Sequence, residues 1–372
     1  MASKILITGG AGFIGSHVAD ELITAGYEVR VLDNLWPQVH GDGASRPAYL
    51  NEDAELIRGD VCDAGAVERA LEGVDAVYHF AAAVGVGQSM YRVADYVRTN
   101  DLGTAVVCEA LIRRHVRRVI VASSLSVYGE GLYSDSRGRL VVNASRTLRQ
   151  LQAGQWDILD DDGVPLEPLE TPESKAVSLA SVYAASKFNQ ETVCLLLGRY
   201  YGIEAVALRF WNVYGPRQAL SNPYTGVLAI FSSRLMNDRP PLINEDGRQQ
   251  RDLVSVHDAA KACRLALETP EAAGQILNIA SGRRITILQL AERLAAAMGK
   301  PHIAPEITGQ YRVGDIRHCV PDITRARAVL GYEPTCTLES SLEEMAAWLG
   351  TQVAHDRVEA SRRELTEQGL AV

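Results

Sequence analysis

Cysteine is scarce in this chain, and no two cysteines are spaced as a pair. The 372 residues hold six cysteines, which are scattered singly with no CxxC motif among them. Isolated thiols of this kind form neither a disulfide framework nor the ligand set of a zinc site. We therefore expect no metal site, and reduced thiols at Cys62, Cys108, Cys194, Cys263, Cys319 and Cys336.

Long apolar runs and basic clusters are missing as well. No stretch stays apolar for eighteen residues, which argues against a membrane-spanning helix. The first apolar run, residues 5–7, is too short for the core of a signal peptide, so a cytoplasmic protein is expected. Lys and Arg number 37 against 46 Asp and Glu, which gives a net charge of −9. Nucleic acid and anionic membranes are therefore not expected partners, and an anionic substrate would need a few well-placed arginines.

The chain is rich in apolar residues that alternate between strand and helix patterns. Hydrophobic residues make up 47% of it, which is ample for a large core. The order of the patterns predicts an α/β fold, a doubly wound parallel sheet of the Rossmann type with a smaller C-terminal α/β lobe. The expected strands are 4–8, 27–33, 55–58, 76–80, 118–122, 203–212 and 276–280, and the expected helices are 14–25, 64–72, 106–113, 182–202, 224–236, 287–298 and 340–350.

Changes along the chain predict two units and a tail. Residues 1–216 and 251–280 are assigned to the nucleotide-binding domain, and residues 217–250 and 281–350 to a substrate-binding lobe. Residues 351–372 have the pattern of a charged helix without an obvious apolar face.

An insertion is expected within the first unit. Residues 131–172 are polar, with Gly, Pro, Asp and Arg interspersed, and predict a surface excursion with one short helix at 146–151. Such a segment is either a solvated loop, or a lid over a site or a subunit contact.

A glycine-rich turn follows the first expected strand. Gly9, Gly12 and Gly15 have the spacing GxxGxxG and lead into the first helix. Without Cβ atoms the backbone can approach a pyrophosphate closely, and the helix N-terminus offers unpaired N–H groups to that anion. A strand before and a helix after are the context that this motif needs. The turn, together with Phe13 and Ile14, is therefore a predicted dinucleotide-binding site.

Carboxylates follow the second and third expected strands. Asp33 ends the second strand, 18 residues after Gly15, where a carboxylate can accept hydrogen bonds from ribose hydroxyls. The same charge would repel a 2′-phosphate, so NAD is favoured over NADP as the cofactor. Asn34 is expected to contact the cofactor beside it, and Asp60 and Val61 could meet the adenine.

A serine, a tyrosine and a lysine supply the expected chemistry. Ser124 follows strand 118–122 at its carboxyl end, where parallel sheets bind ligands. Tyr183 and Lys187 are four residues apart on the helix, so the phenol and the ammonium lie on one face. The lysine and a positively charged nicotinamide ring both favour the phenolate. Such a tyrosine can take a proton from an alcohol while hydride leaves the same carbon.

With these motifs the chain resembles the extended short-chain dehydrogenases/reductases that act on nucleotide sugars. The glycine turn, the Ser124 loop and the Tyr183-x-x-x-Lys187 pair carry the resemblance, which covers roughly residues 4–350. The further matching motifs are His79-Phe80-Ala81-Ala82, Asn100-x-x-Gly103-Thr104, RFWNVYGP at 209–216, Arg251-Asp252 and Arg312-Val313-Gly314-Asp315.

The resemblance implies a role for each matching residue. Tyr183 would be the acid/base, and Lys187 would hold the nicotinamide ribose and lower the pKa of the tyrosine. Ser124 would hydrogen-bond the reacting sugar oxygen. The implied cofactor contacts also include Phe80, Ala81, Ala82 and Asn100. The implied substrate contacts are Ser126, Asn212, Arg251, Arg312 and Asp315, with the asparagine and both arginines on the substrate diphosphate, whose geometry a guanidinium fits.

The resemblance also narrows the reaction to 4-epimerisation of a nucleotide-diphosphate sugar. The 4,6-dehydratases of this family carry Asp-Glu where this chain has Leu125-Ser126, and the 3,5-epimerases place a cysteine in that loop. What remains is oxidation at C4, rotation of the 4-keto sugar about its diphosphate, and reduction on the other face with NAD regenerated. Val84 stands where hexose 4-epimerases often have a polar or basic residue, which fits a 6-deoxysugar. The long insertion also resembles a subgroup of dTDP-L-rhamnose 4-epimerases.

Several alternatives stay open at this point. UDP-glucuronate and UDP-hexose 4-epimerases compete within the class, and a net NAD(P)H-dependent 4-ketoreductase or a decarboxylase could use the same scaffold. A non-enzymatic sugar-nucleotide or NAD sensor would be expected to lack one member of the serine–tyrosine–lysine set. The family usually dimerises through the helix bearing Tyr183 and the one near residues 104–114. A homodimer is therefore expected, with apolar side chains to spare among Val193, Leu195, Leu196 and Leu197.

Overall fold

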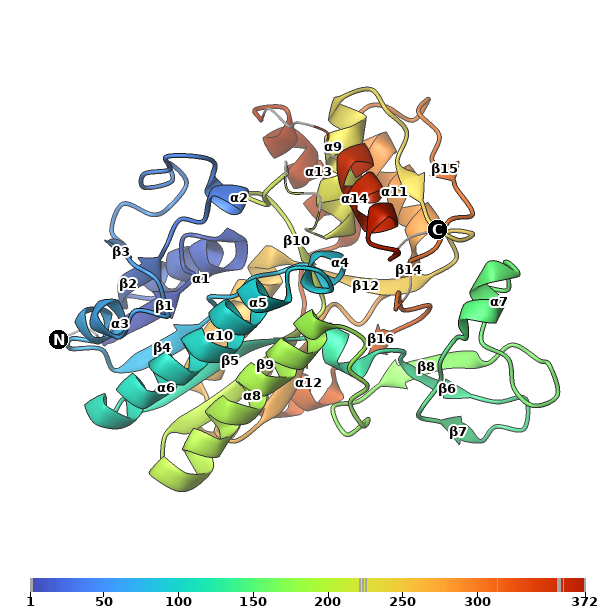
Figure 1. The fold of residues 1–372 in the computed structure, drawn as a ribbon. Coiled ribbons are helices and arrows are strands. Elements are labelled where there is room, and N and C mark those ends of the chain that lie inside the picture. The colour runs from blue at the N-terminus through green and yellow to red at the C-terminus, as the bar shows by residue number, and fades with distance from the viewer. Residues whose placement is uncertain are drawn as a thin grey trace.

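A parallel β-sheet forms the centre of the protein (Figure 1), as a computed structural model shows for residues 3–220, 222, 224, 226–312, 314–352, 356 and 358–370. Within these residues the sheet has seven strands in the order β13-β9-β5-β4-β1-β2-β3, and every neighbouring pair is parallel. This is the predicted doubly wound α/β fold. The strands are β1 Lys4–Thr8, β2 Glu28–Asp33, β3 Glu55–Arg58, β4 Ala76–His79, β5 Arg118–Ser124, β9 Glu204–Phe210 and β13 Ile276–Ile279.

Helices cover both faces of the sheet, which explains why its strands are apolar throughout. In β1, Ile5 and Ile7 pack into the core on one face, whereas Leu6 packs into the core on the other, because successive side chains of a strand point to opposite faces. The first face is covered by α1 Phe13–Thr24, α10 Val256–Glu268 and α12 Thr324–Leu330, and the second by α3 Ala64–Ala70, α6 Gly103–Arg114 and α8 Val182–Tyr201.

A second lobe has its own hydrophobic core. Helices α9 Val227–Met236, α11 Ile287–Ala297 and α13 Leu338–Leu349 pack together there. The lobe also contains a parallel pair, β11 Leu242–Ile243 with β15 Glu306–Ile307. A separate three-stranded sheet contributes side chains to the lobe core; its strands are β10 Asn212–Tyr214, β12 Gln250–Ser255 and β14 Arg284–Thr286. Helix α12 corrects one expected boundary. Its residues were assigned to the lobe, but Ala326, Leu330 and Tyr332 are buried in the core of the large sheet.

The insertion is a small folded unit, and the expectation of a surface excursion with a single short helix was incomplete. It holds the expected helix, α7 Leu148–Gln152, but also β6 Leu132–Ser134, β7 Leu140–Val141 and β8 Glu167–Thr171. These strands form a sheet with β16 Val320–Pro321 from far along the chain, and the unit lies at the lower right of Figure 1. Tyr133, Ile158 and Leu166 form its core, and the polar turns between them hide this pattern in the sequence.

The C-terminal segment contains the expected helix, but its buried side was not predicted. Helix α14, Val358–Glu367, has a buried side formed by Val358, Ser361 and Leu365, where no apolar face was expected. With only two apolar residues among them, this side is hard to recognise in the sequence. No helix in the described ranges combines the length and the apolar character needed to cross a bilayer. The remaining short helices are α2 Pro37–His40, α4 Val86–Ser89, α5 Val93–Tyr96, η1 Val97–Leu102, η2 Leu125–Tyr128 and η3 Pro270–Ala272.

Candidate functional site

One large cavity of about 880 Å³ lies where the carboxyl ends of the central strands face the second lobe. Ligands of doubly wound sheets bind at this edge. The cavity wall includes nearly all the residues predicted for the site. Those found in the wall are Gly9, Gly12, Phe13, Ile14, Gly15, Asp33, Asn34, Asp60, Val61, Phe80, Ala81, Ala82, Val84, Ser124, Ser126, Tyr183, Lys187, Asn212, Arg251, Arg312 and Asp315.

The glycine turn leaves no space for side chains on its protein side. Gly9 has a φ of +70°, and a Cβ there would lie 2.8 Å from the Cα of Ala81. A Cβ on Gly15 would lie 2.6 Å from the Cα of Gly10, so α1 could not pack this closely against the turn. Gly12 caps α1 and brings no capping side chain, which leaves the first-turn amides open. This arrangement fits the pyrophosphate of a dinucleotide.

Asp33 ties the end of β2 to the glycine turn. One carboxylate oxygen accepts a hydrogen bond from the amide of Ala11 at 3.0 Å, and the other accepts one from the amide of Leu35 at 2.9 Å. Burial raises the pKa of Asp33, while the Leu35 amide, His40 and the Ala11 amide act in the opposite direction. A carboxylate with both oxygens already fixed is preorganised to accept further hydrogen bonds from a ribose.

Asn34 and Asp60 form the adjoining part of the wall. The Asn34 amide donates to the Asp60 carboxylate at 3.2 Å, and the Cys62 amide donates to the same carboxylate at 2.8 Å. Burial pushes the pKa of Asp60 upward, but these hydrogen bonds outweigh it and hold the pKa below its usual value.

Ser124, Tyr183 and Lys187 meet in the cavity as the sequence predicted. Ser124 ends β5, and its hydroxyl accepts hydrogen bonds from the hydroxyl of Ser126 at 3.0 Å and from the Ser126 amide at 3.2 Å. Tyr183 is in the first turn of α8, which Ser181 caps by accepting from the amide of Ala184. The cap fixes where α8 begins, and therefore where the phenol enters the cavity.

The electrostatics of the tyrosine differ from the expectation. Burial raises the pKa of Tyr183, and the Ser124 hydroxyl, hydrogen-bonded to the phenol, opposes that rise. Lys187 is not among the described groups that shift this pKa, and its ammonium donates to the Gln190 side chain at 2.6 Å. Burial also lowers the pKa of Lys187 to about 7, against the opposing effects of Cys194 and Glu191. A phenolate therefore needs positive charge from a bound group.

Asn100 is the one predicted contact that does not line the cavity. It is fully buried, and its side chain bonds to both the amide and the carbonyl of Ala83, at 2.7 and 3.1 Å. It also donates to the hydroxyl of Ser186 at 2.8 Å. Asn100 thus joins the segment after β4 to α8, behind the wall, and can act on a ligand only through its neighbours.

The predicted substrate side chains line the lobe side of the cavity with their own polar partners. Asn212 donates to the carbonyl of Asp252 at 2.7 Å, and Arg251 donates to the carbonyls of Gln250 and Arg317. Arg312 donates to the Asp315 carboxylate at 2.9 Å. Between these two residues, Val313 of the predicted motif lies outside the described residues.

Other residues of the wall were missed by sequence reasoning. The Trp211 indole nitrogen, the Gln249 amide oxygen and the Tyr311 hydroxyl are buried and have no hydrogen-bond partner in the described part of the chain. All three residues line the cavity. Buried polar groups normally find partners, so these atoms indicate that a polar ligand binds here. No motif identifies Gln249, whereas Tyr311 and Trp211 lie beside predicted residues.

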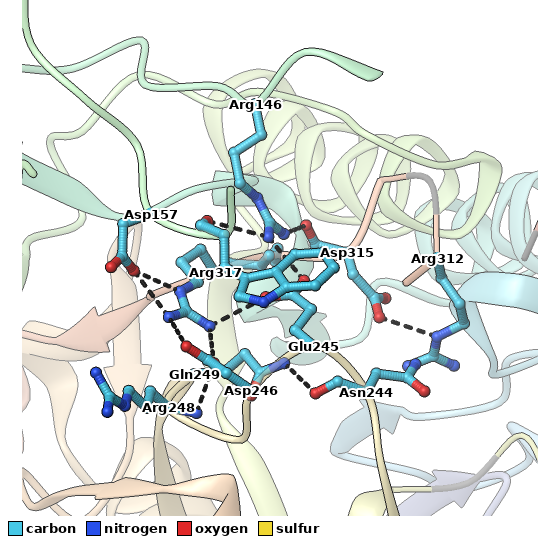
Figure 2. A network of polar contacts seen from close by, with 12 residues as sticks. Arg146, Asp157, Asn244, Glu245, Asp246, Arg248, Gln249, Arg312, Asp315 and Arg317 are labelled. Atoms are coloured by element: carbon cyan, nitrogen blue, oxygen red, sulfur yellow. Dashed lines mark hydrogen bonds and ion pairs between the residues drawn. The ribbon is translucent and has the colours of Figure 1, made fainter. Parts of the chain in front are cut away.

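An ion-pair network joins the insertion to the substrate side of the cavity (Figure 2). Arg317 is 1% exposed and contacts Asp157 of the insertion as well as Glu245 and Asp246 of the lobe, at 2.8, 3.1 and 2.6 Å. Arg146 of the insertion binds the other oxygen of Glu245 at 2.7 Å. Burial raises the pKa of Glu245, although both guanidiniums act in the opposite direction.

The same network reaches the predicted diphosphate residues. Arg146 donates to the carbonyl of Asp315 at 2.6 Å, and the rings of Trp156 and Tyr311 lie 6.3 Å apart. The insertion therefore supports the segment that carries Arg312. Of the two readings left open for the insertion, these contacts favour a role at the site over a solvated loop.

Comparisons with known proteins give a consistent result. Residues 5–280 match the NAD dependent epimerase/dehydratase family. A dTDP-L-rhamnose 4-epimerase from Burkholderia thailandensis is 36% identical over 94% of this chain and 96% of its own length. A dTDP-glucose 4,6-dehydratase from Actinoplanes is 30% identical over 93% of this chain and 97% of its own length.

Solved structures agree with these relatives. A UDP-glucose 4-epimerase from Thermotoga maritima with UDP-glucose has a TM-score of 0.75 at 30% identity, and covers 93% of this chain and 98% of its own. A Thermus thermophilus UDP-glucose 4-epimerase complexed with NAD has a TM-score of 0.72 at 30% identity, and covers 94% of this chain and all of its own.

The position of Asp33 leads to a prediction on cofactor choice. Asp33→Asn removes the charge that would repel a 2′-phosphate, while it keeps one oxygen for the amides that now bind the carboxylate. We expect the ratio of NAD to NADP affinity to fall by about tenfold, a difference of roughly 1.4 kcal/mol. Titration calorimetry with both cofactors measures this ratio. Asp53→Asn, on the exposed surface, is the control, and an unchanged ratio in Asp33→Asn would contradict the assignment.

The ion-pair network leads to a prediction on stability. Glu245→Gln leaves two buried guanidiniums, those of Arg146 and Arg317, without their shared carboxylate. We expect the free energy of unfolding to fall by about 2 kcal/mol, because each guanidinium loses a charged hydrogen-bond partner, although Arg317 keeps Asp157 and Asp246. Urea denaturation measures it. The matched control is Asp162→Asn, which breaks an exposed pair with Arg137 and should cost less than about 1 kcal/mol. Equal losses in both variants would show that the network adds nothing.

Proposed function

Because this chain belongs to the NAD dependent epimerase/dehydratase family, we propose that it is an NAD-dependent 4-epimerase of nucleotide-diphosphate sugars. The observation that carries the proposal is the shared cavity. It brings Ser124, Tyr183 and Lys187 together with the glycine turn on one side and with arginines suited to a diphosphate on the other. This arrangement suits a substrate that carries an alcohol at one end and two phosphates at the other.

Each residue of the site has its own role in the proposed reaction. Tyr183 takes the proton of the sugar 4-hydroxyl, and Ser124 holds the same oxygen by a hydrogen bond. When bound, NAD supplies the acceptor and donor of hydride at that carbon. Arg251 and Arg312 hold the diphosphate while the flat 4-keto sugar turns over. With the hydride returned to C4 on the opposite face, Tyr183 gives the proton back to the same oxygen, so that no net redox change occurs.

Loop composition supports epimerisation over dehydration. Expulsion of water needs an acid and a base beside Ser124, but the loop continues with Leu125 and Ser126. One of the relatives is a dehydratase, so this departure at the site weighs more than overall similarity.

We propose a 6-deoxysugar, with dTDP-L-rhamnose as the first candidate. Val84 presents an apolar side chain, 48% exposed, in the cavity wall, which suits a methyl group better than a hydroxymethyl or a carboxylate. The similarity to the Burkholderia enzyme supports the same choice. UDP-hexoses and UDP-glucuronate are the competing substrates.

The reaction and the substrate can be tested together. NMR spectra of a panel of dTDP-, UDP- and GDP-sugars, incubated with the protein and no added cofactor, should show interconversion of one 4-epimer pair. Net consumption of added NADH would indicate a ketoreductase, release of CO₂ a decarboxylase, and no conversion of any sugar a binding protein.

The role of Tyr183 gives a direct prediction. Tyr183→Phe should keep the fold and the bound NAD but lower kcat at least a hundredfold, because it removes the acid/base. Tyr27→Phe, just before β2 and outside the cavity wall, is the control and should leave kcat unchanged. A Tyr183→Phe variant that retains normal turnover would rule out the mechanism.

A homodimer through α6 and α8 is proposed as the assembly. These helices lie side by side, and exposed apolar residues surround them, although of the four apolar residues expected to be spare only Leu196 is exposed. Large apolar side chains at the surface of this kind indicate a contact with another protein. Those concerned are Val93, Val97, Leu102, Leu196, Tyr200 and Tyr201.

Light scattering after gel filtration tests the dimer. We expect a mass of about twice the 40.4 kDa of the chain, and a monomer for Leu196→Glu, which places a charge in the proposed contact. Leu140→Glu is the control, since Leu140 is 65% exposed in the insertion. A wild-type monomer, or a dimer that Leu196→Glu leaves intact, would contradict the proposal.

A further inference from the structure

The C-terminal helix α14 forms part of the wall of the cavity. Val358, Arg362 and Leu365 line it, and Leu365 packs against α4, where a Cβ on Gly87 would lie 3.1 Å from its side chain. Glu364 accepts a hydrogen bond from the hydroxyl of Tyr224 at 2.5 Å. Helix α14 therefore contacts the segment after β4 as well as the lobe, and its inward side lines the cavity.

Arg362 is the charged residue on this inward side. Its guanidinium donates to Asn244 at 3.2 Å, to Thr308 at 3.4 Å and to Gln310. All three acceptors are neutral. Among the described residues no carboxylate lies within ion-pair distance of it, although other arginines of the wall are paired: Arg312 with Asp315, and Arg217 with Asp20.

Arg362 shares its surroundings with other arginines. Burial lowers the pKa of its guanidinium, and the charges of Arg234 and Arg312 lower it further, against the opposing effects of Glu306 and Glu359. Arg251 also lines the cavity and donates its hydrogen bonds to backbone carbonyls. Partly buried cations that share one cavity repel one another, so this side is stabilised by a ligand with negative charge.

A second observation points to a ligand at the same place. Tyr311 is 5% exposed and Gln249 is 6% exposed, and each has a buried polar atom without a partner in the described ranges, as noted above. Tyr311 precedes Arg312 in the chain, and Gln249 donates to the carbonyl of Asn244, the residue whose side chain binds Arg362. The two unpaired polar atoms thus belong to a neighbour of Arg312 in the chain and to a residue that contacts the Arg362 partner Asn244.

We propose that Arg362 is a third guanidinium of the diphosphate site, acting with Arg251 and Arg312. The proposal rests on the proposed function, which supplies the nucleotide-diphosphate sugar. A diphosphate brings two negative charges and several acceptor oxygens, which three forked cations can satisfy. The role of α14 is then to complete the substrate site.

Nucleotide binding tests the proposal on the full-length, NAD-loaded protein. Titration calorimetry with dTDP, dTMP and thymidine, and with the uridine series, compares the wild type with Arg362→Gln, which keeps a hydrogen-bond donor but loses the charge. We expect the affinity for the diphosphate to fall about tenfold and the affinity for the nucleoside to stay unchanged. Arg363→Gln is the matched control, because Arg363 is the next residue of α14 and is exposed.

Other outcomes would overturn the proposal. Equal losses for diphosphate and nucleoside would mean that Arg362 only anchors α14, and no loss would mean that it does not touch the anion. In steady-state assays, Arg362→Gln should raise KM about tenfold with kcat nearly unchanged, and a fall in kcat alone would also contradict the role. If the wild type epimerises a nucleotide sugar but Arg362→Gln behaves like Arg363→Gln, the role of Arg362 is refuted while the proposed function stands. If the wild type epimerises none of the dTDP-, UDP- and GDP-sugars, the proposed function fails as well.

Discussion

The close approach of the first turn to the end of β4 is the constraint on which the whole site depends. The backbone of Gly9 lies so near Ala81 that not even a methyl group fits between them. This contact sets where α1 begins, and so where its open amides point. It also brings the turn after β1 within reach of the segment after β4 that Asn100 holds in place. A dinucleotide can lie across this edge only because the two segments are this close.

The opposite side of the cavity is organised by charge rather than by close packing. Its arginines come from segments distant in sequence, and the buried network around Arg317 and Glu245 holds those segments in register. Ion pairs of this kind are sensitive to geometry, and when complete they favour one arrangement over others. The insertion therefore belongs to the substrate side of the molecule, although in the sequence it interrupts the nucleotide-binding domain.

The sequence predicts the sheet side of the site well and the lobe side less well. Gly9, Asp33 and Ser124 lie at the carboxyl ends of strands whose apolar runs are unmistakable, so their meeting at one edge follows from the fold. Arg362 and Glu245 cannot be found in this way, because their positions depend on contacts between segments about 50 to 120 residues apart. Spacing places Lys187 one turn from Tyr183, but it does not show that burial raises the pKa of the phenol or that the lysine ammonium donates to Gln190.

The pairing of β8 with β16 has a consequence for how the molecule is made. Thr171 pairs with Pro321, so the strands of the insertion wait for a partner that is synthesised 150 residues later. Contacts between residues so distant along the chain form slowly, because a long loop must lose conformational entropy and close before the contacts can stabilise the fold. Until β16 has been synthesised, the strands within residues 132–171 have an unpaired edge. Unpaired strand edges in a nascent chain are prone to aggregate, and chaperones bind such chains.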